Sequence, residues 1–203
     1  MADRVLRASL VLTKPVFLYG TLLDPELYDI VSGALLEAQP AQLQGAAVFW
    51  VAGESFPILV AAPDAAADGV LVHPSAGARA RLDYYELGFG YTVETRQVQG
   101  MGGPVEADVY VPEGAWPQGA LWSLGDWQSR HGALTRVAAR EYMGLMITHS
   151  PQEAARAFPQ IRMRADSRLR AQAAPSPAPL SPDLSGRAVV PDRTEQPYTD
   201  YFA

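Results

Sequence analysis

Short runs of strand-forming residues, separated by glycine, proline and aspartate, occupy most of residues 15–112. About six of these runs have strand length and carry β-branched or aromatic side chains; they are residues 15–20, 43–51, 56–62, 68–74, 91–99 and 105–112. Few of the connections are long enough for the crossover that joins parallel strands. The pattern therefore predicts an α+β fold, in which a mixed, mostly antiparallel β-barrel of about six strands is flanked by helices.

The clearest strand signal lies near the end of this region. Residues 91–99, YTVETRQVQ, alternate between two faces as a half-solvated antiparallel strand does. The sequence GMGGP at 100–104 supplies a turn into the run at 105–112. We predict that these two runs form a hairpin.

Helices are predicted within the strand-rich region and after it. Asp24 is a candidate N-cap, followed by a proline at the first helical position. Residues 132–147 place apolar side chains near one face of a helix. The sequence SPQE at 150–153 is a capping box for a short helix that Pro159 is expected to end or kink.

The last part of the chain differs in composition, and 203 residues suggest one domain with an appendage. We place the domain at 1–148, an arginine-rich helical extension at 149–171, and a proline-rich linker and tail at 172–203. The extension concentrates arginines, at Arg156, Arg162, Arg164, Arg168 and Arg170. The last four are predicted to form a solvated face in preference to a phosphate site, and docking of a partner domain by the cluster is a separate alternative.

Composition excludes several classes of function. The chain has no cysteine, so disulfides, thiol nucleophiles and cysteine-ligated zinc are ruled out. A net charge of -6 argues against nucleic-acid binding, and no apolar run reaches the roughly 18 to 20 residues of a membrane span. The three histidines lack metal-ligand spacing, and no nucleotide motif has its structural context. We therefore expect a cytoplasmic protein that uses no metal or cofactor.

One carboxylate stands out in the sequence RLDYYELGFGYTVE at 81–94. If residues 76–86 form a helix, Leu82 and Glu86 lie on one face, so Glu86 points the same way as a core leucine. Two interpretations remain open from the residues alone. Glu86 is either held at a helix end by hydrogen bonds to the backbone or to a tyrosine hydroxyl, or it is a catalytic group.

Several motifs together resemble the gamma-glutamylcyclotransferase-like family, also called AIG2-like. They are VFLYGTL at 16–22, FPILV at 56–60, GVLV at 69–72, LDYYE at 82–86, GYTVE at 90–94 and ADVYVP at 107–112. The resemblance implies a compact α+β barrel. It also implies an enzyme that cyclises a gamma-glutamyl amine to 5-oxoproline and a free amine, with Glu86 as its acid and base.

The same resemblance assigns the strand-to-helix turn at residues 19–22 to substrate binding. Backbone N–H groups at such a turn can hold a carboxylate or an oxyanion, so Tyr19, Gly20, Thr21 and Leu22 are candidates to hold the glutamyl end of the substrate. The alternative is a merely structural turn. Tyr91 and Tyr110 are candidates to line the pocket, against ordinary core packing.

The sequence departs from the family after the proposed catalytic residue. Members commonly have glycine directly after the glutamate and arginine after the following tyrosine, whereas here Leu87 and Gly88 follow Glu86 and Thr92 follows Tyr91. These departures leave the choice of substrate open.

The C-terminal extension resembles the segment of bacterial fusion proteins, some named for tellurite resistance, in which such a domain precedes a Nudix hydrolase. No Nudix signature occurs in these 203 residues. The resemblance implies a piece of a longer protein with an intramolecular Nudix partner. It also gives an alternative to catalysis, a regulatory module that binds a small carboxylate ligand.

Overall fold

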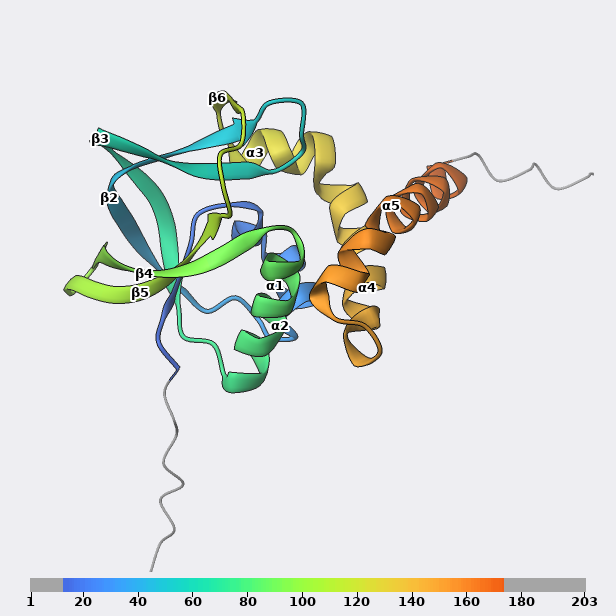
Figure 1. Cartoon of the computed structure of the whole chain (residues 1–203), viewed down its shortest axis with the longest axis horizontal. Helices are drawn as coiled ribbons and strands as arrows, with labels where there is room; N and C mark the ends of the chain where they lie inside the picture. The colour runs from blue at the N-terminus through green and yellow to red at the C-terminus, as the bar shows by residue number, and fades with distance from the viewer. Residues whose placement is uncertain (1–12, 174–203) are drawn as a thin grey trace, which may run out of the picture.

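Five strands of a six-stranded sheet close into a barrel, the sixth strand adds to its edge, and the helices gather on one side (Figure 1). The computed structural model describes residues 13–173. The strand order is β3-β1-β5-β4-β2-β6, and an additional pairing of β2 with β3 closes the barrel. The strands are β1 (Val16–Leu18), β2 (Ala38–Val51), β3 (Pro57–Val72), β4 (Tyr91–Gly100), β5 (Gly103–Pro112) and β6 (Gln118–Leu121). Among these strands only β1 and β5 pair in parallel. The prediction of a mixed, mostly antiparallel barrel in an α+β fold is confirmed.

Two details of the strand prediction were wrong. The runs at 56–62 and 68–74 are one strand, β3, because the whole segment pairs with β2 from Ala38↔Val72 to Trp50↔Pro57. The register shifts between Gln44 and Ala46, where Gly45 has a φ of 74°, so the long hairpin bends at a bulge. Strand β6, which adds to the edge of β2, has little strand-like composition and was not predicted. The hairpin of β4 and β5 is confirmed, with pairs from Tyr91↔Pro112 to Gly100↔Gly103.

The longer helices are α1 (Pro25–Ser32), α2 (Ala76–Gly88), α4 (Ala133–Gly144) and α5 (Pro151–Ala173). Shorter helical segments are η1 (Thr21–Leu23), α3 (Leu124–Trp127), η2 (Gln128–Gly132) and η3 (Leu145–Ile147). Asp24 caps α1 as predicted, since its Oδ1 accepts the Leu27 N–H at 2.9 Å. Ser150 and Glu153 form the predicted capping box at the start of α5, each accepting the other's backbone N–H.

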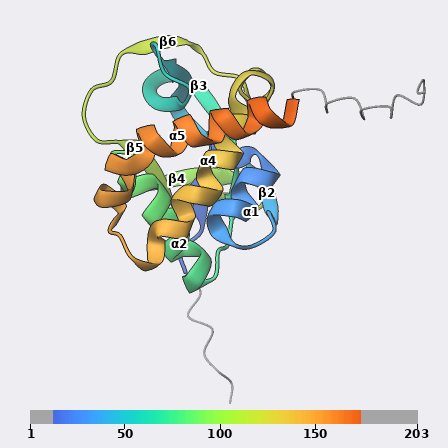
Figure 2. The ribbon, with the colours of Figure 1, turned by 90° about the vertical axis from the view of Figure 1, so that its right-hand side faces the viewer.

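Helix α5 does not end at Pro159 but continues to Ala173, so the prediction of a short helix was wrong. A proline inside a helix removes a backbone hydrogen bond. That loss is offset here by the burial of Ala154, Ile161 and Ala165, which belong to the core shared by the helices. Figure 2 shows α5 crossing over α4, and α5 also contacts α2. The predicted linker and tail lie almost wholly outside the described residues.

Apolar side chains form two cores. One fills the barrel and includes Phe17, Leu43, Leu71, Val98 and Val109. The other lies between the barrel wall and the helices, and α2 takes part in it through the fully buried Leu82. No helix within residues 13–173 is long and apolar enough to cross a membrane.

Glycine at position 88 permits a close contact between α2 and its neighbours. A Cβ there would lie 2.0 Å from the Tyr142 hydroxyl oxygen and 2.9 Å from the Pro151 carbonyl oxygen. No side chain fits in this space. The end of α2 is therefore held directly against α4 and the first residue of α5.

Candidate active site

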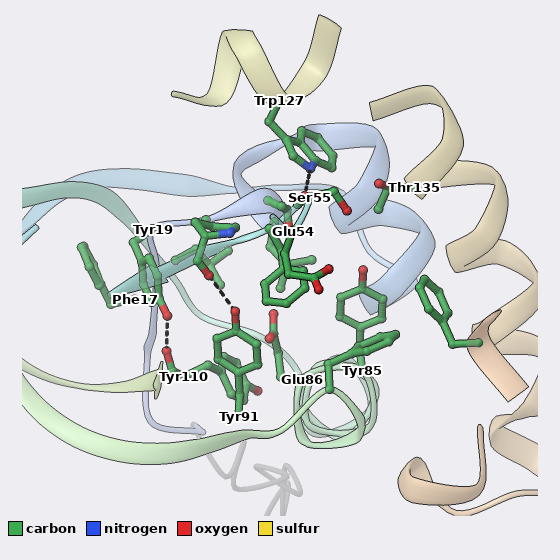
Figure 3. A pocket seen from close by; sticks show the side chains of 18 of the residues that line it. Phe17, Tyr19, Glu54, Ser55, Tyr85, Glu86, Tyr91, Tyr110, Trp127 and Thr135 are labelled. Carbon is green, nitrogen blue, oxygen red and sulfur yellow. Dashed lines mark hydrogen bonds between the residues drawn. The ribbon is translucent and has the colours of Figure 1, made fainter. Parts of the chain in front are cut away.

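A cavity of about 230 Å³ opens where β1, the β2–β3 turn, α2, α4 and α5 meet (Figure 3). Its walls are mainly aromatic and aliphatic, with two carboxylates and one guanidinium. The lining residues are Phe17, Leu18, Tyr19, Gly20, Thr21, Leu22, Glu54, Ser55, Phe56, Pro57, Tyr85, Glu86, Phe89, Tyr91, Tyr110, Trp127, Thr135, Phe158 and Arg162. Every residue predicted for the site is in this set.

Glu86 lies in the last turn of α2, and its carboxylate points into the cavity between Tyr91 and Tyr85 (Figure 3). It is half-buried, and no group of residues 13–173 donates a hydrogen bond to it. Burial among these aromatic rings raises the pKa of Glu86 to about 8, because the charged form loses hydration. The sequence left two interpretations of Glu86 open. The first, in which hydrogen bonds to the backbone or to a tyrosine hydroxyl hold its side chain, is not observed within the described residues.

The helix that carries Glu86 is fixed at both ends. Ser75 caps its start by accepting the Ala78 N–H, and Leu82 anchors its middle in the core. After Glu86 the ring of Phe89 stacks on Tyr142 at a centroid distance of 4.9 Å and meets Phe158 edge-on at 4.7 Å. The carboxylate is thus presented by a rigid element.

The strand-to-helix turn at residues 19–22 forms the wall on the barrel side of the cavity. Strand β1 ends at Leu18, and η1 begins at Thr21. The N–H groups of Thr21 and Leu22 have no acceptor within residues 13–173, as expected for the first turn of a helix. A Cβ at Gly20 would lie 3.0 Å from the Cγ of Pro57, so a larger residue would crowd the opposite wall.

The three predicted tyrosines have their hydroxyl groups fixed by hydrogen bonds. Tyr19 donates to the Tyr110 carbonyl oxygen at 2.6 Å, and Tyr91 donates to the Pro57 carbonyl oxygen at 2.7 Å. Burial, as the largest cause, raises the pKa of each of these tyrosines above the ordinary value. They therefore stay neutral and form rigid walls at neutral pH.

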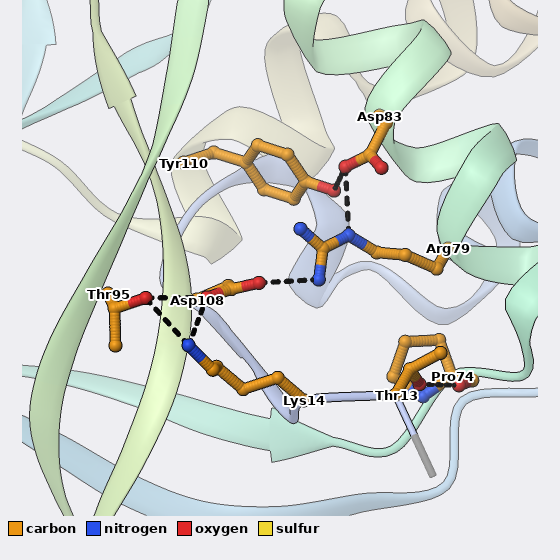
Figure 4. A network of polar contacts seen from close by, with 8 residues as sticks. All are labelled: Thr13, Lys14, Pro74, Arg79, Asp83, Thr95, Asp108 and Tyr110. Atoms are coloured by element: carbon orange, nitrogen blue, oxygen red, sulfur yellow. Dashed lines mark hydrogen bonds and ion pairs between the residues drawn. The ribbon is translucent and has the colours of Figure 1, made fainter. Parts of the chain in front are cut away.

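Tyr110 also links the cavity to a polar network behind it (Figure 4). Its hydroxyl donates to Asp83 at 2.7 Å, and Arg79 bridges Asp83 and Asp108 at 2.9 and 2.7 Å. Because Arg79 and Asp83 belong to α2 and Asp108 to β5, the network fixes the rotation of α2 against the barrel. That rotation sets where Glu86 points.

Sequence reasoning missed the residues that reach the cavity from elsewhere in the chain. Glu54 and Ser55 come from the β2–β3 turn, and Trp127 donates its indole N–H to the Ser55 carbonyl oxygen at 3.1 Å. Figure 3 shows the Glu54 carboxylate reaching over the cavity above Glu86. No local signal marks these residues, because only the packing of the barrel against the helices brings them together.

The arginines of α5 have different surroundings. Arg164 and Arg168 pair with Glu141 of α4, and Arg170 pairs with Asp166. Arg162 lines the cavity instead. Among residues 13–173, no group of three or more histidine, aspartate or glutamate side chains is arranged to hold a metal ion.

Comparison with known proteins identifies a family for most of the described chain. A family model described as gamma-glutamyl cyclotransferase, AIG2-like, matches residues 16–129. No curated protein matches the chain.

Several solved structures are similar to this chain at low sequence identity. A protein of Arabidopsis thaliana is 22% identical, with a TM-score of 0.48, covering 59% of this chain and 74% of its own. An AIG2-like protein of Mus musculus is 20% identical, with a TM-score of 0.44, covering 54% and 88%. A gamma-glutamyl cyclotransferase is 15% identical, with a TM-score of 0.46, covering 76% and 98%.

Proposed function

The chain belongs to the gamma-glutamyl cyclotransferase, AIG2-like family, and we propose that it converts a gamma-glutamyl amine to 5-oxoproline and a free amine. The observation that carries this proposal is the Glu86 carboxylate. It faces a mainly apolar cavity, has no hydrogen-bond donor among residues 13–173, and has a pKa of about 8. Such a group is costly to a fold and suited to proton transfer.

In the proposed reaction the α-amine of the glutamyl group attacks its own γ-carbonyl carbon. The new C–N bond closes a five-membered ring, and the C–N bond to the departing amine then breaks. Nucleophile and electrophile belong to one molecule, so the protein has only to hold the folded-back conformer. The rigid tyrosine walls at Tyr19, Tyr91 and Tyr110 serve that purpose.

Glu86 carries the proton between the two nitrogens. The substrate α-ammonium has an ordinary pKa near 8 and must lose a proton before it can attack. Glu86 accepts this proton and donates it to the departing nitrogen, which leaves as a neutral amine. The attack leaves a second proton on the ring nitrogen; this proton is lost as the intermediate collapses, and the released amine takes one up, so the carboxylate ends in its starting state. General acid–base transfer of this kind contributes about 10² to 10⁴ in rate.

The turn at residues 19–22 supplies the polar contacts of the glutamyl end. The N–H groups of Thr21 and Leu22 have no acceptor within the described residues, so they are available to a substrate carboxylate or to the oxyanion that forms on the γ-carbonyl oxygen. Losing one such donor to an oxyanion costs on the order of 3 kcal/mol of transition-state stabilisation. Gly20 keeps the turn thin enough for close approach.

The reaction is tested directly with a panel of gamma-glutamyl compounds. We expect release of 5-oxoproline together with one equivalent of free amine from at least one compound, measured by chromatography of both products. Ligands that raise the melting temperature without being converted would instead support a binding module. Absence of both turnover and stabilisation across the panel would contradict the proposal.

The pH dependence of kcat/KM provides a second test. The reactive complex holds one proton shared between Glu86 and the substrate amine, whose pKa values both lie near 8. At lower pH both groups are protonated, and at higher pH both are deprotonated, so the rate is expected to fall on both sides of a maximum near pH 8. A rate that stays constant down to pH 5 would contradict a role for Glu86, because a carboxylate of ordinary pKa is already ionised there.

A further inference from the structure

Three residues that line the cavity lie outside the family match at residues 16–129. Thr135 belongs to α4, while Phe158 and Arg162 belong to α5. Figure 3 shows Thr135 on the side of the cavity away from Tyr19. The helices that follow the matched region therefore add a wall to the cavity, on the side away from Tyr19 of the turn at residues 19–22.

We propose that Arg162 binds an anionic group on the amine half of the substrate, so that the protein prefers gamma-glutamyl amines whose leaving amine carries a carboxylate. This inference rests on the proposed function and names the substrate class of the same site. It assigns Arg162 as a specificity-determining residue.

The position of Arg162 is fixed by the packing of α5. Phe158 and Arg162 are four residues apart and so lie on one face of the helix, and Phe158 meets Phe89 and Tyr142 edge-on at centroid distances of 4.7 and 6.0 Å. Two residues of α5 on either side of Arg162, Ile161 and Ala165, are almost fully buried. The guanidinium therefore starts from a rigid stretch of helix at the cavity.

Arg162 differs from Arg164, Arg168 and Arg170 in having no ion-pair partner within residues 13–173, and it differs from Arg156, which also has none there, in lining the cavity. Arg164 and Arg168 use their charge to hold α5 on α4 through Glu141. Within residues 13–173, no carboxylate lies within ion-pair distance of Arg162, although it stands at the edge of an acidic cavity. Its five donors remain available to a ligand.

The carboxylates of the cavity repel an anionic leaving group, so its binding requires the positive charge of Arg162. Glu54 and Glu86 both line the cavity, and Arg162 is the one cation among the described lining residues. The neighbouring His131 does not add a charge at neutral pH, because burial and then the charge of Arg162 lower its pKa. A substrate carboxylate at the mouth is repelled by Glu54 unless Arg162 binds it.

The arrangement of the cavity walls indicates which half of the substrate Arg162 contacts. The turn at residues 19–22 and Glu86 face the reacting glutamyl group in the proposed reaction. Arg162 comes from α5, which packs on α4, the helix that brings Thr135 to the side of the cavity away from Tyr19, and its side chain is exposed. A group that reaches Arg162 therefore belongs to the half of the substrate that departs.

The test compares gamma-glutamylglycine with gamma-glutamylglycinamide, which differ by one carboxylate. For each protein we take the ratio of kcat/KM for gamma-glutamylglycine to kcat/KM for gamma-glutamylglycinamide. This ratio is expected to be about tenfold higher in the unsubstituted protein than in Arg162→Gln. The change should lie mainly in KM, because Arg162 contacts the substrate both before and during the reaction. Arg162→Lys should retain most of this preference. Arg156→Gln is the matched control, because Arg156 lies on the same helix, forms no ion pair among residues 13–173 and does not line the cavity. Because each variant is compared on both compounds, the intrinsic reactivity of the leaving amine cancels.

Binding of both compounds to Glu86→Gln and to Glu86→Gln/Arg162→Gln, measured by calorimetry, separates this inference from the proposed function. Turnover with an equal preference in the unsubstituted protein and in Arg162→Gln would overturn the inference and leave the reaction standing. Absence of turnover with an Arg162-dependent preference in binding would support the inference and contradict the reaction. Absence of any binding would overturn both.

Discussion

Replacing Glu86 by glutamine is expected to lower kcat for 5-oxoproline release by about 10² to 10⁴. Glutamine keeps the size and shape of the side chain but cannot exchange a proton with the substrate amine. The rate that remains would come from holding the folded-back conformer, which does not depend on the carboxylate. Steady-state kinetics on the best compound of the panel measures the effect, and KM is expected to change much less than kcat.

The same substitution should stabilise the fold, which separates a catalytic loss from unfolding. The pKa of Glu86 in the folded protein is about 8, above its ordinary value of 4.5, so its ionisation weakens the fold as pH rises from about 4.5 to about 8. Removing the ionisable group should raise the free energy of unfolding by on the order of 2 to 3 kcal/mol at pH 7. The difference from the unsubstituted protein should vanish below pH 4.5.

Glu54→Gln is the matched control for this prediction, since it removes the other carboxylate of the cavity. Glu54 is exposed at the mouth, where water rather than the protein solvates it. We expect it to lower kcat by less than tenfold. Equal losses in Glu54→Gln and Glu86→Gln, or a fully active Glu86→Gln, would show that Glu86 is not the acid and base.

The barrel and the inner part of the site could be predicted because their signals are local. Strand alternation, the turn after β1 and the i, i+4 spacing of Leu82 and Glu86 are all visible within about ten residues. The family resemblance then placed these separate signals in one cavity, which the structure shows they share.

The outer part of the site could not be predicted, because it depends on contacts between distant segments. Arg162 looks like its neighbours Arg164 and Arg168 in the sequence, and only the packing of α5 on α4 and α2 decides which of them faces the cavity. The predicted length of α5 was wrong for the same reason. The unfavourable helix propensity of Pro159 can be seen in the local sequence. The burial of Ile161, which offsets it, depends on contacts with distant segments.

Asp24→Ala is expected to destabilise the protein by about 3 to 5 kcal/mol, because it breaks a buried ion pair and removes the carboxylate that also caps α1. Asp24 is 1% exposed. Besides capping α1, it accepts hydrogen bonds from Arg136 Nε at 2.8 Å, Arg136 Nη2 at 2.6 Å and Gln128 Nε2 at 2.8 Å. One carboxylate thus joins α1 to η2 and α4. Urea unfolding at pH 7 measures the loss, and a value within 1 kcal/mol of the unsubstituted protein would contradict the predicted role.

Glu26→Ala is the control for charge alone, because Glu26 also contacts Arg136 and Arg140 but is about half exposed. An exposed pair contributes at most about 1 kcal/mol, so this variant should unfold close to the unsubstituted protein.

The pH dependence of stability identifies the ionised form of Asp24 as the stabilising one. The hydrogen bonds from Arg136, as the largest cause, lower the pKa of Asp24 from 3.8 to about 2. A depressed pKa means that the stabilisation is fully present above about pH 3.8 and is lost as the pH falls toward 2. In Asp24→Asn this part of the acid-induced loss should be missing, while the overall stability at pH 7 is already lower. Since Asp24 directly follows η1, which carries Thr21 and Leu22 into the cavity, both Asp24 variants should also raise KM for the gamma-glutamyl substrate at temperatures where they remain folded.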